Sequence, residues 1–318
     1  DDALELLEDL DNVKRDNTGR ISRSVLKKYN FLNDGGWYAY GFDVETGEYS
    51  SFVCVKPDNP RWDSQKQKPI KYEHPRGRAT ELFAPAIPIS VANSIAFRAG
   101  GEAFTKWESF RDNYQGNPDF AIWEFSKKAG NIQLHITEGF KKCSSLISQG
   151  FLTVAFSGIW NWIDKDADKF IDVRGKQKRR KQLTKKLASL TGGKRESVIW
   201  FDEDSKASTR RDVAYAQTNL GKALSKEGCK VSIASWNPED GKGIDDAIAL
   251  NGKDWLEDVY ASRLSLSAWL YWNQRLSHID RTFNKQFLTK DDIDTAAKIL
   301  GIKSAKGTGK TEGTADYI

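Results

Sequence analysis

Three acidic residues stand where apolar runs of the sequence end. Glu138 closes the alternating run over residues 132–137, and Asp202 and Asp204 form an Asp-x-Asp pair after a second apolar run. In an extended chain, residues i and i+2 point to the same side, so the two aspartates would share one side. Carboxylate oxygens are the ligands that Mg²⁺ prefers in proteins. These residues therefore predict a divalent-metal site.

The elements that would position these acids alternate between strands and helices. Strands are predicted over residues 132–137, 151–158, 197–202 and 229–236, and helices over 140–149, over 207–227 and from residue 245. Such alternation is typical of βαβ units and a mostly parallel sheet. In that kind of sheet the carboxyl ends of the strands share one edge, where ligands bind. We expect Glu138, Asp202 and Asp204 to converge there, with Asp245 or Asp246 as a further acid.

The chemistry that this arrangement predicts is phosphoryl transfer. A metal ion on Asp202 and Asp204 would polarise a phosphate and stabilise the attacking or leaving oxygen. Glu138 would move a proton if neighbouring carboxylates raise its pKa. Each acid by itself would more often be a solvated loop residue or a helix cap. The three together, each after a strand, favour the metal site.

A basic segment lies between the two acidic motifs. Residues 174–186 contain eight Lys or Arg and no acid. Such a cluster attracts a nucleic-acid backbone by displacing counterions, although charge runs are also common on solvated helices and mobile loops. The candidate phosphate or nucleic-acid ligands in this segment are Lys176, Lys178, Arg179, Arg180 and Lys181.

Further candidates flank this segment. Arg210 and Arg211 open the helix after the Asp-x-Asp pair and could bind phosphate or pair with Asp212. Trp160 and Trp162 follow the second strand and could stack on bases, although tryptophans at such positions more often fill a core. His135 is expected to be an ordinary strand residue.

The composition sets limits on the class of protein. The chain has 318 residues, of which 39% are hydrophobic, with 11 Trp and a net charge of +5. This length and content predict about two or three folded domains. Three scattered cysteines without a CxxC pair argue against a disulfide framework and a zinc site. No apolar run approaches a membrane span, so we expect a cytoplasmic protein without a membrane partner.

The order of the motifs resembles the TOPRIM domain of primases, topoisomerases and some nucleases. The resemblance consists of Glu-Gly after the first strand, Asp-x-Asp after the third and a later acid. More closely, "ITEGFKKC", "GIWNW", "WFDEDSKASTRR" and "GKGIDDAI", with "KPDNPR", "IKYEHPRG" and "LFAP" upstream, look like TOPRIM-like domains of large plasmid and phage replication proteins, especially cyanobacterial ones. The similarity covers about residues 50–250.

This resemblance implies roles for the matching residues. Glu138 would be the general acid/base, while Asp202 and Asp204 would hold Mg²⁺. The full implied metal-ligand set is Asp202, Asp204, Glu138, Asp245 and Asp246. Lys141 and Lys142 stand where the family often has a lysine pair and would face phosphate. The chain departs from the family at Glu203, where TOPRIM proteins commonly have a small residue.

The segment "SAKGTGKT" at residues 304–311 resembles the phosphate-binding loop of helicase-type ATPases. In an intact ATPase, Gly309 would help to cradle the phosphates, Lys310 would reach the β- and γ-phosphates, and Thr311 would hold Mg²⁺. A working loop also needs a following helix and a distant acid. We therefore expect the severed start of a helicase domain; the alternative is a Gly/Lys-rich tail with a chance match.

These observations predict an α/β protein with a TOPRIM-like, mostly parallel four-stranded sheet flanked by helices, a smaller N-terminal α+β domain and a helical C-terminal linker. The predicted divisions are an acidic N-terminal helix or arm at 1–26, the small domain at 27–130, the catalytic domain at 131–252, the linker at 253–303 and the truncated loop segment at 304–318.

The predicted activity is DNA-dependent primer synthesis with Mg²⁺ or Mn²⁺ and nucleoside triphosphates. The partners would be single-stranded or plasmid-origin DNA and a C-terminal helicase domain absent from this fragment. One alternative keeps the metal site in a nuclease or nicking enzyme that initiates replication. Another is a non-catalytic DNA-binding module that recruits the helicase.

Overall fold

The computed structural model describes residue 7 and residues 13–65, 67–76, 78, 80–129 and 131–273. The predicted ATP-loop residues Gly309, Lys310 and Thr311 lie outside the described residues. So do residues 1–6 and 8–12 of the predicted N-terminal helix or arm and residues 274–303 of the predicted linker.

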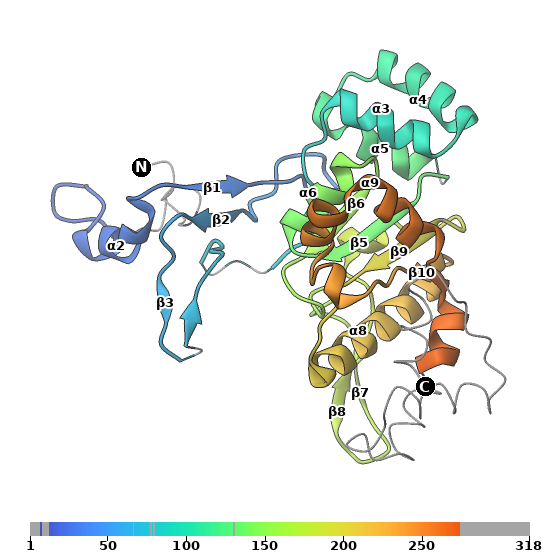
Figure 1. Cartoon of the computed structure of the whole chain (residues 1–318). Helices are drawn as coiled ribbons and strands as arrows, with labels where there is room; N and C mark the ends of the chain where they lie inside the picture. The colour runs from blue at the N-terminus through green and yellow to red at the C-terminus, as the bar shows by residue number, and fades with distance from the viewer. Residues whose placement is uncertain are drawn as a thin grey trace.

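A five-stranded sheet forms the centre of the structure, in the order β11-β10-β9-β5-β6 (Figure 1). Its strands are β5 (Leu134–Glu138), β6 (Thr153–Phe156), β9 (Glu196–Trp200), β10 (Lys230–Ile233) and β11 (Leu264–Ser265). The first four are mutually parallel and match the predicted strands, whereas β11 pairs antiparallel with β10. The predicted count of four strands is therefore corrected to five. A two-residue strand is too short to show alternation, and its region is predicted as helix.

Helices cover both faces of this sheet. Helices α6 (Phe140–Ser148) and α9 (Ile244–Ala261) pack on one face, and α8 (Ala207–Lys226) packs on the other. Strand β9 shows the division, because successive side chains point to opposite faces. Val198 and Trp200 join a core cluster with α9, whereas Ile199 joins the cluster that contains the buried residues of α8. Both faces are therefore buried, as parallel sheets require.

A bundle of short helices shares the core of the sheet. It consists of α3 (Ile89–Arg98), α4 (Gly101–Asn113), the 3₁₀ turn η2 (Pro118–Phe120) and α5 (Ala121–Lys128). Trp107 and Trp123 are fully buried in the same cluster as Leu134 and Ile136 of the sheet. The predicted boundary at residue 130 stays a prediction, and the hydrophobic core contains residues from both sides of it.

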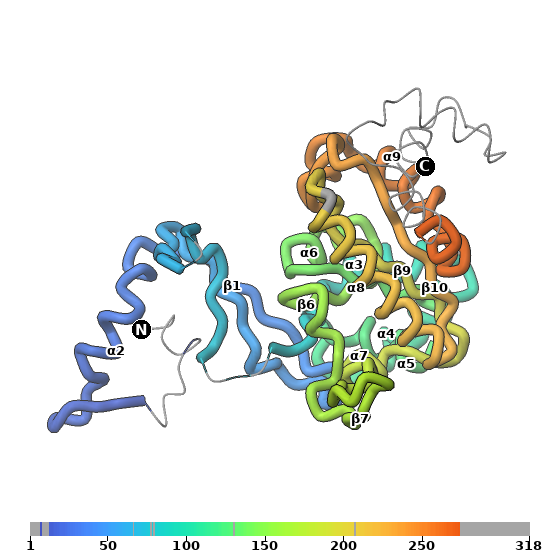
Figure 2. The backbone as a smooth tube through the Cα atoms, turned by 90° about the horizontal axis from the view of Figure 1, so that it is seen from below, coloured from blue at the N-terminus to red at the C-terminus, as the bar shows by residue number. Residues whose placement is uncertain are grey.

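The N-terminal segments extend to one side of the sheet (Figures 1 and 2). They include α2 (Arg23–Lys28), η1 (Asn30–Leu32), the antiparallel pair β1 (Gly36–Ala39) and β2 (Cys54–Pro57), and the pair β3 (Trp62–Asp63) and β4 (Lys68–Pro69). They have a small core of their own, made of Leu7, Val25, Tyr29, Phe31, Val53 and Val55.

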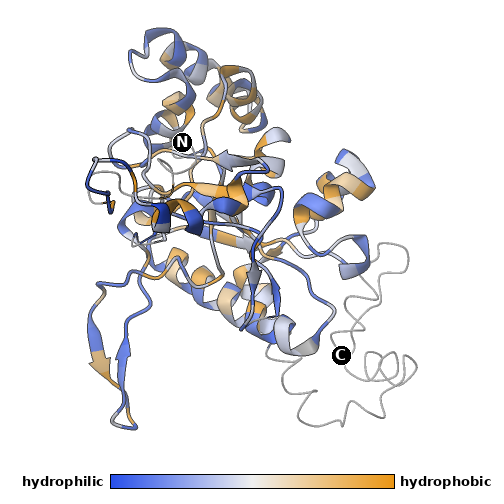
Figure 3. Cartoon of the chain, turned by 90° about the vertical axis from the view of Figure 1, so that its left-hand side faces the viewer, coloured by the Kyte–Doolittle hydropathy of each residue, from blue (hydrophilic) through white to orange (hydrophobic). Residues whose placement is uncertain are grey.

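A basic hairpin occupies the predicted insertion after β6. Its strands are β7 (Lys169–Ile171) and β8 (Gln177–Arg179), and the short helix α7 (Lys185–Ala188) follows. Figure 3 shows the hairpin projecting from the body, hydrophilic on one strand and partly hydrophobic on the other. A further 3₁₀ turn, η3 (Pro238–Asp240), precedes α9.

His135 is a core residue, as the sequence suggested. It is 1% exposed, and the Trp200 indole donates a hydrogen bond to its Nδ1 at 2.9 Å. Burial lowers the pKa of His135 to about 3, so the ring is neutral and able to accept this bond. Within the part of the chain that the structure describes, no helix combines the length and apolar character needed to cross a bilayer.

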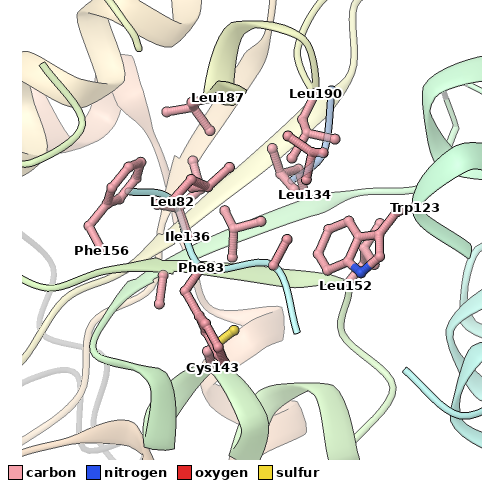
Figure 4. Packing of buried hydrophobic residues seen from close by; sticks show 14 of the residues in the cluster. Leu82, Phe83, Trp123, Leu134, Ile136, Cys143, Leu152, Phe156, Leu187 and Leu190 are labelled. Atoms are coloured by element: carbon pink, nitrogen blue, oxygen red, sulfur yellow. The ribbon is translucent and has the colours of Figure 1, made fainter. Parts of the chain in front are cut away.

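Core packing at Ile136 yields a stability prediction. Ile136 is fully buried among apolar side chains of the sheet and of the segments that cover it (Figure 4). Ile136→Ala should lower the free energy of unfolding by about 2–5 kcal/mol, because it removes buried methyl groups and leaves a cavity. Ile171, which is 73% exposed, supplies a matched control, and Ile171→Ala should change stability by less than about 0.5 kcal/mol. Urea unfolding of both variants tests the difference.

Candidate active site

The carboxyl ends of β5, β6 and β9 meet at one edge of the sheet. Thr137 stands opposite Trp200 in the ladder, and its hydroxyl donates to the Trp200 carbonyl at 2.7 Å. Glu138 stands opposite Phe156, and the backbone N–H of Gly139 donates to the Phe156 carbonyl at 2.8 Å. Glu138 is the last residue of β5, and Asp202 follows the end of β9 by two residues. The two acids therefore leave the sheet at nearly the same level, as expected for neighbouring parallel strands.

Lys142 lies among three of the predicted site carboxylates. Its Nζ is 2.8 Å from Asp202 Oδ1 and donates a hydrogen bond to Oδ2 at 3.0 Å. It also interacts electrostatically with Glu138 and Asp245. Helix α6 begins directly after Gly139, so Lys142 in its first turn lies close to the end of β5. The lysine is therefore the common counter-ion of this edge.

Gly243 allows the close approach of these groups. A Cβ atom at this position would lie 2.7 Å from Lys142 Cε and 2.6 Å from Asp245 Oδ1. Both distances are far shorter than van der Waals contact, so any side chain here would displace the lysine or the aspartate. The glycine before α9 is thus what lets the loop after β10 close onto α6.

Asp204 is paired with a different lysine. Lys242 Nζ donates to Asp204 Oδ2 at 2.6 Å, and the backbone N–H of Lys206 donates to Oδ1 at 2.8 Å. The Lys242 hydrogen bond is the main cause that holds the pKa of Asp204 below its ordinary value. Lys242 is absent from the sequence-predicted site. Its position after the fourth strand, between two glycines, is the signal that could have placed it at this edge.

Glu203 explains how the chain accommodates a large residue between the two aspartates. Its side chain accepts a hydrogen bond from the Ser235 hydroxyl at 2.6 Å, and its backbone N–H donates to the Lys242 carbonyl at 3.0 Å. It therefore ties the loop after β9 to the loop after β10. Burial raises the pKa of Glu203 to about 7 despite these bonds. The sequence identifies Glu203 only as a departure from the TOPRIM pattern, whereas in the structure it links the two loops by hydrogen bonds.

Burial also raises the pKa of two predicted catalytic carboxyls. For Glu138 the largest cause is desolvation, opposed by Lys142 and reinforced by Asp202. For Asp202 desolvation is again the largest cause, opposed by the charge and hydrogen bond of Lys142. The predicted contribution of neighbouring carboxylates is present but smaller than that of burial. A carboxyl with a raised pKa is suited to proton transfer near neutral pH.

The donor set suits a hard divalent cation. Asp245 Oδ1 is buried without a hydrogen-bond partner among the described residues, and Asp202 Oδ1, also buried, has only the ion-pair contact with Lys142 Nζ at 2.8 Å. Asp246 is exposed beside them. Oxygen-only donors with unused lone pairs fit Mg²⁺ or Mn²⁺ rather than zinc. As they stand, no three carboxylate, histidine or cysteine groups of the described segments lie in a metal-binding cluster, and the ammonium group of Lys142 contacts Asp202 directly.

A cavity of about 490 Å³ opens beside this edge. Trp37 and Phe140 form an aromatic wall, with ring centroids 4.9 Å apart in an edge-to-face arrangement. Lys141 Nζ lies 3.6 Å from Asp245 Oδ2 at the polar side of the cavity. The complete lining is Trp37, Ala39, Phe140, Lys141, Ser144, Ser145, Asp245, Asp246 and Ala249.

The remaining predicted residues lie farther along the surface. Arg210 and Arg211 are exposed at the start of α8. The basic residues of the hairpin are exposed as well, and Lys178 pairs with Asp172 at 2.6 Å. Those that the sequence predicted and the structure places at the surface are Lys176, Lys178, Arg179 and Arg180, with Lys181 half-buried.

The comparisons with known proteins match different extents of the chain. Residues 122–255 match the model of a family described as a domain of unknown function, DUF3854. An uncharacterized protein of Picosynechococcus sp. is 34% identical over 302 residues, which make up 94% of this chain and 29% of that relative. This chain therefore spans less than a third of the relative's length.

Two solved structures are similar over most of the chain. The DnaG primase catalytic domain bound to ssDNA is 15% identical with a TM-score of 0.42, covering 88% of this chain and 70% of that one. The RNA polymerase domain of Mycobacterium tuberculosis primase DnaG, solved with double-stranded DNA, is 14% identical with a TM-score of 0.43, covering 99% and 76%.

The raised pKa of Glu203 predicts a pH dependence of stability. Its folded-state pKa is about 7 against an ordinary 4.5, so the folded protein retains this proton to higher pH than the unfolded chain. Stability from this group is full below about pH 4.5 and is lost as the pH rises through 7. The free energy of unfolding of the wild type should fall between pH 5 and pH 8. In Glu203→Gln this fall should be smaller by about 1–3 kcal/mol, because the amide does not titrate. Urea unfolding at both pH values measures it, and identical pH profiles for variant and wild type would contradict it.

Proposed function

We propose that this chain catalyses metal-dependent phosphoryl transfer on nucleic acid, and specifically the synthesis of primers on a DNA template. The observation that carries the proposal is the convergence of Glu138, Asp202 and Asp245 on Lys142 at the carboxyl edge of a parallel sheet. Among the described residues, the buried Asp245 Oδ1 has no hydrogen bond, and the buried Asp202 Oδ1 has only its ion-pair contact with Lys142. The motif order that resembles TOPRIM domains supports the same chemistry.

Each residue of the carboxylate edge has its own role in the proposed reaction. Asp202 and Asp245, with Asp204 nearby, would hold Mg²⁺ or Mn²⁺, which supplies charge neutralisation at the phosphate. Glu138 accepts the proton of the attacking hydroxyl. The hydroxyl oxygen forms the new bond to the α-phosphorus of a nucleoside triphosphate, and the bond to the diphosphate leaving group breaks. Lys142 and Lys242 stand beside these acids and stabilise the negative charge on the phosphate oxygens.

The cavity beside Asp245 is suited to the nucleoside part of this substrate. Its volume of about 490 Å³ lies within the range of small-ligand sites. The rings of Trp37 and Phe140 offer an apolar wall to a base, while Lys141 and Asp245 stand at its polar side. A nucleotide held there would direct its phosphates toward the carboxylate edge.

Substitution at the acids tests the proposed activity. The full chain is incubated with single-stranded DNA, labelled nucleoside triphosphates and Mg²⁺ or Mn²⁺, and products are sized on a denaturing gel. Glu138→Gln should lower the rate of oligomer formation by about 10²–10⁴-fold, because it removes the proton acceptor. Glu102, an exposed acid on α4 paired with Lys106, supplies the control Glu102→Gln, which should keep the wild-type rate.

Other products would redirect the proposal. Shortened or nicked DNA that depends on Glu138 would assign the same carboxylates to a nuclease. Binding without any product would favour a non-catalytic DNA-binding module. Undiminished oligomer synthesis by Glu138→Gln would remove this residue from the mechanism.

Metal binding has a readout that is independent of activity. Mg²⁺ should raise the thermal midpoint of the wild-type chain, because it binds the folded carboxylate edge and not the unfolded chain. Asp202→Asn should abolish most of this increment, whereas Asp254→Asn, at an exposed position of α9, should preserve it. Differential scanning fluorimetry with and without Mg²⁺ measures both. Equal increments for the two variants would contradict the assignment of Asp202 as a ligand.

A further inference from the structure

An aromatic pair at the root of the basic hairpin encloses a lysine. Trp160 follows β6, Lys181 follows β8, and Tyr215 lies in the first half of α8. The Lys181 Nζ is 5.2 Å from the Trp160 ring centroid and 4.5 Å from that of Tyr215. The two rings are 5.5 Å apart. Three segments that are distant in sequence thus build one small surface, which we call the Trp160–Tyr215 platform.

The ammonium groups of Lys181 and Lys178 have different kinds of partners. Lys181 donates to the Tyr215 hydroxyl at 3.1 Å and to Asn219 Oδ1 at 2.8 Å, and both partners are neutral. Among the described residues, no carboxylate forms an ion pair with it. Lys178, in contrast, pairs with Asp172 at 2.6 Å. The platform therefore carries a net positive charge held in place by neutral contacts.

The platform is rigid on one side and open on the other. Trp160 is half-buried and packs against Trp162, which is fully buried, with ring centroids 6.5 Å apart. Tyr215 is 57% exposed and lies on α8, so its backbone is fixed by the helix. An exposed ring on a fixed backbone, next to a cation, loses little conformational entropy when a flat ligand stacks on it.

The surrounding charges indicate an anionic partner. The hairpin that rises from the platform presents exposed basic residues, namely Lys169, Arg174, Lys176, Lys178, Arg179 and Arg180, which outnumber the paired Asp172 within it and the exposed Asp166 and Asp168 at its start. Aromatic rings next to basic residues are suited to single strands, because each base offers a face for stacking and each linkage a phosphate for a basic residue to neutralise. Paired bases of a duplex keep their faces stacked on each other and cannot use such a ring.

The platform also lies on the side of the sheet that carries the acids. Strand β6 ends beside Glu138, and Trp160 follows that end. Helix α8 begins just after Asp204, and at 1.5 Å per residue Tyr215 lies about 12 Å along it from Ala207. Trp160 and the start of α8 therefore lie near the edge that carries the acids, and Tyr215 lies farther along the helix.

We propose that Trp160, Lys181 and Tyr215 form a stacking site for an unpaired base of single-stranded nucleic acid, with the β7–β8 hairpin binding the adjoining backbone. This inference rests on the proposed function in one respect, since it takes nucleic acid to be the substrate of the acidic edge. Tyr215 supplies the exposed ring, Trp160 the rigid backing, and Lys181 the charge for the neighbouring phosphate.

Direct binding tests this site without reference to catalysis. The full chain is titrated into a fluorescently labelled oligothymidylate, and anisotropy gives the dissociation constant at several salt concentrations. Tyr215→Ala should weaken binding about 5- to 100-fold, whereas Tyr215→Phe should stay within about 3-fold of wild type because it keeps the ring. Lys181→Ala should also lower the slope of log affinity against log salt by about 1.

Tyr38 provides a matched control. It is 53% exposed on β1, and Tyr38→Ala should leave the dissociation constant unchanged. Equal affinities of wild type and Tyr215→Ala, or equal affinities of wild type for the oligonucleotide and for a duplex of the same length, would overturn the stacking site. The Asp202→Asn variant should bind the oligonucleotide as wild type does, because Asp202 lies outside the platform. If the wild-type chain binds through the Tyr215 ring but forms no product, the platform is supported and primer synthesis is refuted.

Discussion

The burial of several carboxylates beside Lys142 is the physical constraint on which the site depends. Charges of one sign cannot be taken out of water together unless an opposite charge compensates them. Lys142 provides that compensation for Asp202 directly, at 2.8 Å, and for Glu138 and Asp245 through space. The compensation is incomplete, because desolvation still raises the pKa of both Glu138 and Asp202. The edge therefore favours the approach of a further cation and the retention of protons.

The loops that carry these acids are held by bonds between neighbouring strands rather than by the strands alone. Glu203 binds Ser235 and the Lys242 backbone, and Lys242 in turn binds Asp204. Gly243 leaves room for the Lys142 side chain, because a Cβ there would lie 2.7 Å from Lys142 Cε and the lysine would have to shift. A large residue between the two aspartates thus has a structural role, because it hydrogen-bonds the loop after β9 to the loop after β10.

The surface divides into regions with different chemistry. The edge of the sheet concentrates acids with their lysines, whereas the hairpin after β6 concentrates bases with one paired aspartate, Asp172. The Trp160–Tyr215 platform lies between them. An overall charge of +5 conveys little of this, because the separation of the charges in space, and not their sum, decides what each region attracts.

The sequence by itself determined the alternation of strands and helices and the position of each acid at a strand end. Both follow from local periodicity, since the apolar runs at 132–137 and 229–236 can only be buried as strands of a covered sheet. It did not determine β11, because two residues show no period. Tertiary structure alone decided the partners of the acids, since the choice of Lys142 for Asp202 and of Lys242 for Asp204 depends on how helix α6 and the loop before α9 close over the edge. Tertiary structure also decided which of two nearby tryptophans is buried. The chain turns after β6, so Trp162 is fully buried in the core while Trp160 is half-buried.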